Sequence, residues 1–135
     1  MKKLIVLSGN SQRNQAWGEA CAAQFAPWFD TVYTQQYDHW QTGEKDINIE
    51  AELAKLLQET SDETVTYYIF AKSVGSLLTL LAAHRGYVRP VHCIFFGMPL
   101  ELAGSGIFKD DWSALSDFGV SSLAFHNDED PISYS

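Results

Sequence analysis

Cysteine, proline and basic residues are all scarce in this chain of 135 residues, which has two Cys, four Pro and nine Lys and Arg. Cys21 and Cys93 lie far apart inside apolar runs, so they match neither a disulfide framework nor a metal-binding pair. We expect buried free thiols and a reducing, cytoplasmic setting. The nine basic residues are outnumbered by 17 acidic ones, giving a net charge of −8. This charge argues against nucleic acid and anionic membranes as partners.

Long hydrophobic runs are also missing. No apolar stretch approaches the ~20 residues that a membrane-spanning helix needs. The run from Leu4 to Leu7 follows a basic pair, but it is too short for the apolar region of a signal peptide and ends at a Gly-Asn turn. Hydrophobic residues nevertheless make up 46% of the chain. That content is enough for one packed core, and we expect a single domain over residues 1–135.

Strand-like and helix-like apolar patterns alternate along the chain. Near-continuous apolar runs, which are typical of buried strands, cover residues 3–8, 31–37, 64–70, 91–96 and 121–125. Apolar residues at helical spacing cover residues 16–29, 49–59 and 74–84. This alternation predicts an α/β fold, with a mostly parallel central sheet and helices on both of its faces.

The sequence also predicts four local details. Pro27 is expected to end or kink the first helix near its C-terminus. Residues 38–48 are rich in turn formers and predict no regular element, whereas residues 97–120 form a looser segment with a short helix around residues 112–115. In the helix over residues 49–59, the buried side is expected to hold Ala51, Leu53, Ala54, Leu56 and Leu57.

Polar clusters follow three of the predicted strands. Ser8-Gly9-Asn10 ends the first strand, Lys72-Ser73 follows the strand over residues 64–70, and residues 126–130 follow the last strand. The carboxyl ends of parallel strands meet at one edge of a sheet, where α/β proteins place their functional residues. The sequence therefore predicts one site at this edge.

Ser73 stands between a strand and a helix, with small residues two positions to either side. Ala71 and Gly75 give the pattern A-x-S-x-G, which suits a turn too tight for larger side chains. The following helix would direct its N-terminal amides at the turn, where attack on a carbonyl group creates negative charge. The amide of Val74 would be one oxyanion donor.

At this point the chain resembles an α/β-hydrolase, and the resemblance extends over most of its length. "LIVLSGNSQ" is similar to the first core strand and oxyanion loop of that family, which implies that Asn10 or Ser11 carries the second donor amide. "VYTQQYDHWQTG" and "CIFFGMP" resemble the next strand and the strand after the elbow helix. "LAFHNDEDPIS" resembles the segment with the catalytic acid, which implies Asp130 in that role, with His126 and Asn127 in the two leading positions.

The resemblance implies a serine hydrolase that acts on a small ester or related acyl substrate through an acyl-enzyme, without cofactor or metal. The chain departs from the family at Ala71 and Asn127, where glycine is usual, and no histidine follows Asp130. The missing base is expected from residues beyond position 135, if the chain is C-terminally incomplete, or from a partner subunit. Because residues 97–120 are too few for a separate lid, we expect no cap domain and an open site.

The four histidines of the chain offer one internal candidate for the base. His39 follows the second predicted strand, at the correct edge of the sheet. His84 lies about three helical turns from Ser73, and His92 begins a strand at the opposite edge. His126 shares its short segment with Asp130 and is expected to be structural.

Plainer interpretations remain open for several of these residues. Ser73 could be an ordinary helix N-cap, Asp130 could be a turn residue with Asp128 as the alternative acid, and Trp40 is expected to pack at the surface. Lys72 is expected to be a solvated lysine rather than a base, because adjacent strand residues point to opposite faces. A second hypothesis for the whole chain is a hydrolase-fold protein without catalysis, which binds partners or forms a homo-oligomer through an unfinished sheet edge.

Overall fold

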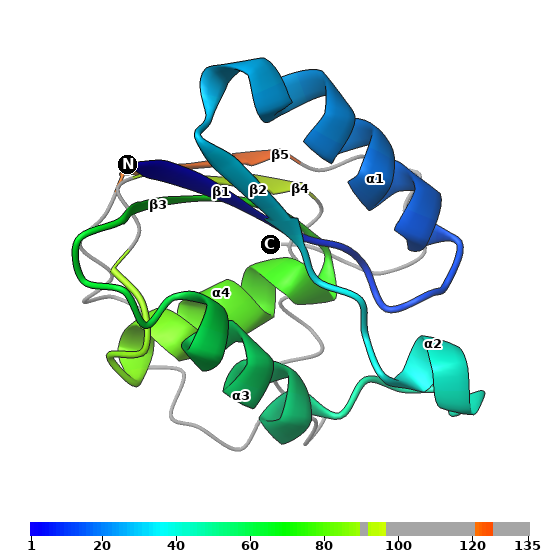
Figure 1. Cartoon of the computed structure of the whole chain (residues 1–135). Helices are drawn as coiled ribbons and strands as arrows, with labels where there is room; N and C mark the ends of the chain where they lie inside the picture. Colours follow the sequence, from blue (N-terminus) through cyan, green and yellow to red (C-terminus); the bar gives the residue numbers. More distant parts are fainter. Residues whose placement is uncertain (90–91, 97–120, 126–135) are drawn as a thin grey trace.

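The computed structural model describes residues 1–89, 92–96 and 121–125, and the elements below lie within these ranges (Figure 1). Five strands and their connecting helices follow one another in the order β1 (Lys2–Leu7), α1 (Asn14–Phe25), η1 (Ala26–Trp28), β2 (Thr31–Thr34), α2 (His39–Thr42), α3 (Ile49–Glu59), β3 (Thr66–Lys72), α4 (Val74–His84), β4 (His92–Phe96) and β5 (Ser121–Phe125). The short helix expected around residues 112–115 and the segment 97–120, on which the absence of a cap rests, lie outside the described residues.

The strands form one sheet in the order β2-β1-β3-β4-β5, and every neighbouring pair is parallel. The predicted α/β fold with a parallel sheet is therefore confirmed. The chain leaves β1 toward β2 on one side and later leaves β3 toward β4 on the other side. The carboxyl ends of β1 and β3 thus flank the point where the winding of the sheet reverses, which is where open α/β sheets bind their ligands.

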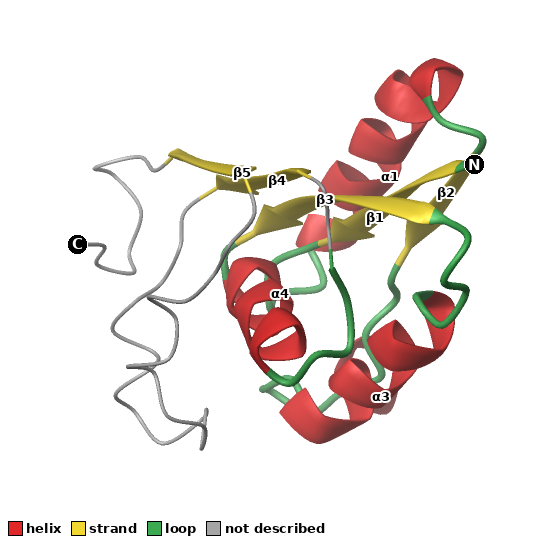
Figure 2. Cartoon of the chain, turned by 90° about the vertical axis from the view of Figure 1, so that its left-hand side faces the viewer, coloured by secondary structure: helices red, strands yellow, loops and turns green. Residues whose placement is uncertain are grey.

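Helices cover both faces of the sheet. The helix α1 packs on one face, while α3 and α4 pack on the other (Figures 1 and 2). Alternate residues of β1 supply both cores, since Leu4 and Val6 join the cluster on the α1 side and Ile5 and Leu7 join the larger cluster under α3 and α4. Burial on both faces explains why this strand is a continuous apolar run in the sequence.

All eight helices and strands that the apolar patterns predict are present, with boundaries that differ from the predicted ones by at most four residues. The helices over residues 49–59 and 74–84 and the strand over residues 121–125 have the predicted limits. The first helix ends at Phe25, before a 3-10 turn that contains Pro27, so the proline does end it. The strand β2 stops at Thr34, and the turn-rich stretch contains the unpredicted four-residue helix α2. None of the described helices is both long and apolar enough to cross a bilayer.

The buried side of α3 differs from the prediction. Leu53 and Leu56 are buried as expected, and Ala51 is half-buried, but Ala54 and Leu57 are exposed, so the prediction for those two residues was wrong. Their place is taken by Glu52, which is fully buried. Its carboxylate accepts hydrogen bonds from Gln35 Nε2 at 3.0 Å and from the backbone N–H of Asp38 at 2.9 Å, and it pairs with Lys55 Nζ at 2.8 Å. These partners offset the desolvation of the charge.

Candidate functional site

Two of the three predicted polar clusters meet at the carboxyl edge of the sheet. The register of β1 and β3 pairs Leu7 with Ala71, so the loop after β1 and the turn after β3 begin side by side. The strand β5 is parallel to both and ends at Phe125, so the third cluster follows a strand that ends at the same edge. Its residues His126, Asn127, Asp128 and Asp130 lie outside the described residues, and the role of Asp130 stays a prediction.

Ser73 has an unusual backbone conformation. Its φ is 53° and its ψ is −120°, and it is the one non-glycine residue with positive φ in the described part of the chain. Such a conformation costs about 1–3 kcal/mol and is typical of functional sites. The side chain of this residue is partly exposed. The sharp turn that the A-x-S-x-G pattern predicted is therefore present.

Close packing explains why the residues around Ser73 are small. A Cβ atom added at Gly75 would lie 2.4 Å from the carbonyl oxygen of Leu7, a backbone atom that cannot rotate away. Glycine at this position lets the first turn of α4 rest directly on the end of β1. Ala71, the residue two positions before the serine, is fully buried. The turn is thus held between two adjacent strands and the helix above them.

The hydroxyl group of Ser73 is not used as a helix cap. Ser73 occupies the N-cap position of α4, but its side chain makes no capping hydrogen bond, and only its carbonyl oxygen accepts a bond, from the N–H of Ser76 at 2.9 Å. An N-cap serine is favoured because its oxygen accepts from an orphan N–H. The plain N-cap interpretation therefore lacks its physical basis here.

The backbone amide of Val74 begins the helix α4 and faces the same turn. The first N–H groups of an α-helix have no intrahelical acceptor, and they carry the positive end of the helix dipole. No acidic residue lies in the first turn of α4. No carboxylate of its own first turn therefore neutralises this helix start, which agrees with the predicted oxyanion role of Val74.

Hydrogen bonds to both oxygen atoms of Asn10 hold the loop after β1 in place. Its carbonyl oxygen accepts from Trp40 Nε1 at 2.9 Å and from His39 Nε2, and its Oδ1 accepts from the N–H of Ile47 at 2.9 Å. Its Nδ2 donates to the carbonyl oxygen of Lys45 at 3.1 Å. Within the described residues, no group accepts the backbone N–H of Asn10 or of Ser11. Both residues thus keep a free amide for the oxyanion role that the sequence predicted.

Tyr37 fixes the start of the same loop. Its side chain is fully buried, and its hydroxyl donates to the carbonyl oxygen of Ser8 at 2.6 Å. Burial, with the nearby Glu52 carboxylate, raises the pKa of this phenol well above its usual value, so it stays a donor over the whole physiological range. The loop is therefore tied down at Ser8 and again at Asn10.

His39 is not a free base for Ser73. It is buried, and its Nε2 donates to the carbonyl oxygen of Asn10, which means that the proton resides on this nitrogen. Its Nδ1 is also buried and has no hydrogen-bond partner. Neither ring nitrogen of His39 is hydrogen-bonded to Ser73, so the structure gives no support to His39 as the internal base. Trp40, expected at the surface, is buried beside it at 8% exposure.

The other two described histidines lie away from the turn. His84 ends α4, a helix of 11 residues, which makes it roughly 16 Å long. His92 begins β4 in register with Tyr68, and the two rings lie 5.8 Å apart. His126 lies outside the described residues. None of the described histidines is hydrogen-bonded to Ser73, and the source of the expected base stays a prediction.

Lys72 turns toward the opposite face of the sheet. Its Nζ lies 5.2 Å from the centroid of the Trp17 ring on α1, so the side chain is half-buried over an aromatic ring. Its expected direction agrees with this position, but its expected full solvation was wrong. Desolvation raises the pKa of the nearby Cys21 thiol, and the positive charge of Lys72 partly offsets this rise.

Both cysteines are free thiols, Cys93 buried and Cys21 half-buried. Burial raises the pKa of Cys93 to about 12, which keeps it an unreactive thiol. Within the described ranges, no group of three or more His, Cys, Asp or Glu side chains is arranged to hold a metal ion.

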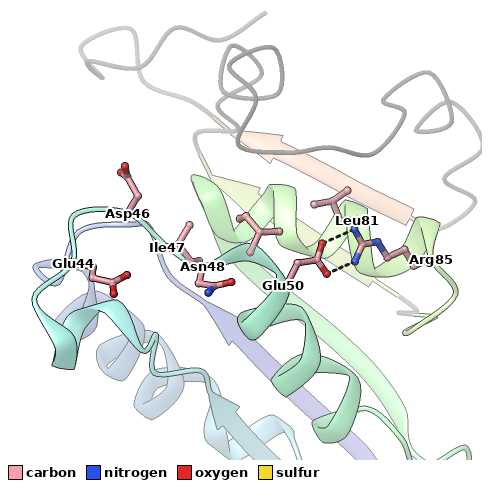
Figure 3. Close-up of a pocket in the computed structure, with 8 residues that line it drawn as sticks. Glu44, Asp46, Ile47, Asn48, Glu50, Leu81 and Arg85 are labelled. Atoms are coloured by element: carbon pink, nitrogen blue, oxygen red, sulfur yellow. Dashed lines mark hydrogen bonds and ion pairs between the residues drawn. The ribbon is translucent and has the colours of Figure 1, made fainter.

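A pocket of about 460 Å³ lies at the other end of α4 (Figure 3). Arg85 spans it by two hydrogen bonds to the carboxylate of Glu50, at 2.9 and 3.0 Å. Because Ser73 is at the opposite end of the helix, this pocket does not serve the turn. The described residues that line it are Glu44, Asp46, Ile47, Asn48, Ile49, Glu50, Leu81 and Arg85.

Comparison of the chain with known protein families, with curated proteins and with solved structures finds no match.

Proposed function

We propose that this chain is a serine hydrolase of the α/β-hydrolase type, which acts on a small ester or a related acyl substrate. The observation that carries the proposal is Ser73: a strained backbone presents an uncapped hydroxyl at the carboxyl edge of a parallel sheet, beside a free helix N-terminus. Strain of this kind persists only where the surrounding structure over-determines it. In α/β-hydrolases the nucleophile lies on a sharp, strained strand-to-helix turn, because this turn exposes its side chain.

In the proposed reaction, the Ser73 oxygen attacks the acyl carbon while an imidazole removes the hydroxyl proton. The carbonyl oxygen becomes an oxyanion, which accepts hydrogen bonds from the amide of Val74 and from a second amide in the loop after β1. Collapse of this intermediate expels the alcohol, which takes the proton from the imidazole. Water then attacks the acyl-enzyme by the same steps in reverse, releasing the carboxylic acid and restoring Ser73.

The acid and the base of this mechanism are assigned by the resemblance to α/β-hydrolases, because neither lies among the described residues. Asp130 would orient the imidazole and stabilise its protonated form. The imidazole would come from residues beyond position 135 or from a partner subunit. The reaction needs no cofactor, and a site without a cap would favour small or exposed acyl groups.

The first prediction tests this function with a fluorophosphonate probe, which forms a covalent bond only with an activated serine. We expect the full-length protein to be labelled on the peptide that contains Ser73 and to hydrolyse p-nitrophenyl acetate. Ser73→Ala should abolish the label and lower kcat by roughly a thousandfold or more. Mass spectrometry locates the label, and the hydrolysis rate is followed by absorbance.

Ser76→Ala is the matched control, since Ser76 lies in the same helical turn and its buried hydroxyl has no partner. This variant should be labelled and active like the natural chain. Labelling that survives Ser73→Ala would contradict the assignment of the nucleophile.

A second candidate function is binding without catalysis, and one observation favours it. None of the three histidines among the described residues is hydrogen-bonded to Ser73. A hydrolase that lacks its base loses several orders of magnitude in rate. Such a protein would use its fold for binding, for example by pairing the edge of its sheet with a second copy. An unlabelled Ser73 together with a concentration-dependent dimer in sedimentation would support this alternative.

A further inference from the structure

The carbonyl oxygen of Asn10 receives two side-chain donors from one short element. Trp40 Nε1 donates to it at 2.9 Å, and His39 Nε2 donates to the same oxygen. Both residues belong to α2, the four-residue helix that follows β2. Two donors on one loop carbonyl fix the direction of that C=O bond much more tightly than a single bond would.

The direction of the Asn10 C=O bond also fixes the direction of the next backbone N–H group. The C=O of Asn10 and the N–H of Ser11 belong to the same peptide unit, which is planar and trans, so the two groups point in opposite directions. With the carbonyl held toward α2, the N–H of Ser11 must point away from α2. The side chain of Asn10 prevents the unit from rotating, because it is bonded to the backbone of both Lys45 and Ile47.

Aromatic packing keeps the two donors in place. The rings of Trp40 and His39 lie 4.8 and 5.9 Å from the ring of Tyr37, and the His39 ring is stacked on it. Tyr37 in turn bonds to the carbonyl oxygen of Ser8. The helix α2 and the loop after β1 are therefore joined at two carbonyl groups, one on each side of Gly9.

We propose that His39 and Trp40 are positioning residues, which fix the N–H of Ser11 as the second oxyanion donor. This inference rests on the proposed hydrolase function and chooses Ser11 over Asn10. The two bonds to the carbonyl also polarise the peptide unit, which makes its N–H a stronger donor. Because an oxyanion exists in the transition state and not in the bound ester, the two residues act on kcat and not on KM.

The second prediction uses Trp40→Phe, which keeps an aromatic ring against Tyr37 and removes the indole donor. With p-nitrophenyl acetate and the full-length protein, we expect kcat to fall roughly tenfold, because loosening an oxyanion donor costs less than the 10²–10³ of removing it. KM should change by less than about twofold, since ground-state binding is untouched. Trp28→Phe is the matched control, because Trp28 is 66% exposed on η1 and distant in sequence from the loop.

A pair of variants at His39 separates the hydrogen bond from packing. The Nε2 of a glutamine can take the place of the imidazole Nε2, so His39→Gln keeps the donor, whereas His39→Leu fills the space without one. We expect His39→Gln to retain most of kcat and His39→Leu to lose roughly tenfold. Thermal unfolding of both variants shows whether they fold. Equal losses of kcat in the two folded variants would overturn the positioning role.

The choice of Ser11 is tested by replacing single backbone amides with esters, which have no N–H. A synthetic peptide of residues 1–20 can be joined to the remainder of the full-length protein at Cys21 by native chemical ligation. An ester between Asn10 and Ser11 should lower kcat by about 10²–10³, and an ester between Gly9 and Asn10 should lower it much less. The reverse order would overturn the choice of Ser11.

Failure of this inference and failure of the proposed function give different results. If the protein is labelled at Ser73 and both Trp40→Phe and His39→Leu keep the natural kcat, the positioning role is wrong and the hydrolase remains. If the unmodified protein is neither labelled nor active on p-nitrophenyl acetate, the hydrolase proposal fails, and this inference fails with it.

Discussion

The helices α3 and α4 lie on the same face of the sheet, but their starts differ in backbone conformation, in capping and in the charge of the first turn. At the start of α3, Asn48 has extended backbone with φ −92° and ψ 101°, and its Oδ1 accepts from the N–H of Ala51 at 3.1 Å. Glu50 and Glu52 add negative charge in the first turn. At the start of α4, Ser73 has a positive φ, caps nothing, and is followed by no acidic residue in the first turn.

The contrast separates a helix start that the chain caps from one that it leaves uncapped. The chain itself satisfies the positive end of α3, with one cap and two carboxylates. Among the described residues, the start of α4 has neither a side-chain cap nor an acidic residue in its first turn, and a strained residue occupies its N-cap position. The start of α3 therefore serves stability, whereas the start of α4 is the one that the proposed function assigns to the oxyanion. Changes at each start should have different effects on stability and on reactivity.

The third prediction, with the largest effect on stability, concerns Gly75. In Gly75→Ala, the new Cβ would lie 2.4 Å from the carbonyl oxygen of Leu7, so α4 must move away from β1. We expect a loss of roughly 3 kcal/mol in the free energy of unfolding, as is typical of overpacking against a rigid group. Urea unfolding measures it. Ser76→Ala in the next position should leave stability unchanged or raise it, because it removes an unpartnered buried hydroxyl.

The fourth prediction compares two replacements of Ser73 itself. Glycine adopts positive φ without the steric penalty that a Cβ brings, whereas alanine retains that penalty. We expect Ser73→Gly to be more stable than Ser73→Ala by about 1 kcal/mol, while neither variant reacts with the fluorophosphonate probe. Equal stability of the two variants in urea would show that the backbone of Ser73 is not strained in solution.

The fifth prediction, with the smallest effect, breaks the cap of α3. Asn48→Ala removes the acceptor of the Ala51 N–H, which should cost about 1 kcal/mol. Labelling of Ser73 should be unchanged, since the start of α3 takes no part in the proposed reaction. Urea unfolding and the rate of fluorophosphonate labelling are the two measurements. A slower labelling rate in this variant would contradict the separation of the two helix starts.

Much of the fold could be predicted from local pattern. The bounds of α3 and α4 follow from apolar residues at helical spacing, and the continuous apolar runs identify buried parallel strands. The turn at Ser73 was also accessible, because the pattern of Ala71, Ser73 and Gly75 lies within five residues of the sequence. A pattern of neighbouring residues is visible in a single sequence, even though the contact of Gly75 with Leu7 that explains it is not.

The features that were missed depend on distant partners. The bond from Trp40 to Asn10 joins residues 30 positions apart and leaves no periodic trace in the sequence. The helix α2 has four residues, fewer than a periodic pattern needs. The burial of Glu52 contradicts the ordinary preference of a carboxylate for water, and it is explained only by Gln35, Asp38 and Lys55. The hydrogen bond from His39 to the carbonyl oxygen of Asn10 also joins residues that are distant in sequence, so the sequence offered His39 as a candidate base without showing this bond.

The central position of β1 has a consequence for synthesis on the ribosome. This strand is made before the other four, yet it pairs with β2 on one side and with β3 on the other. One row of its backbone groups, beside the buried residues Leu4–Leu7, stays without a partner until residues 66–72 have left the exit tunnel. An apolar strand with an open edge is an aggregation hazard while it waits. The two halves of the site, on the loop after β1 and the turn after β3, can meet only when that delay ends.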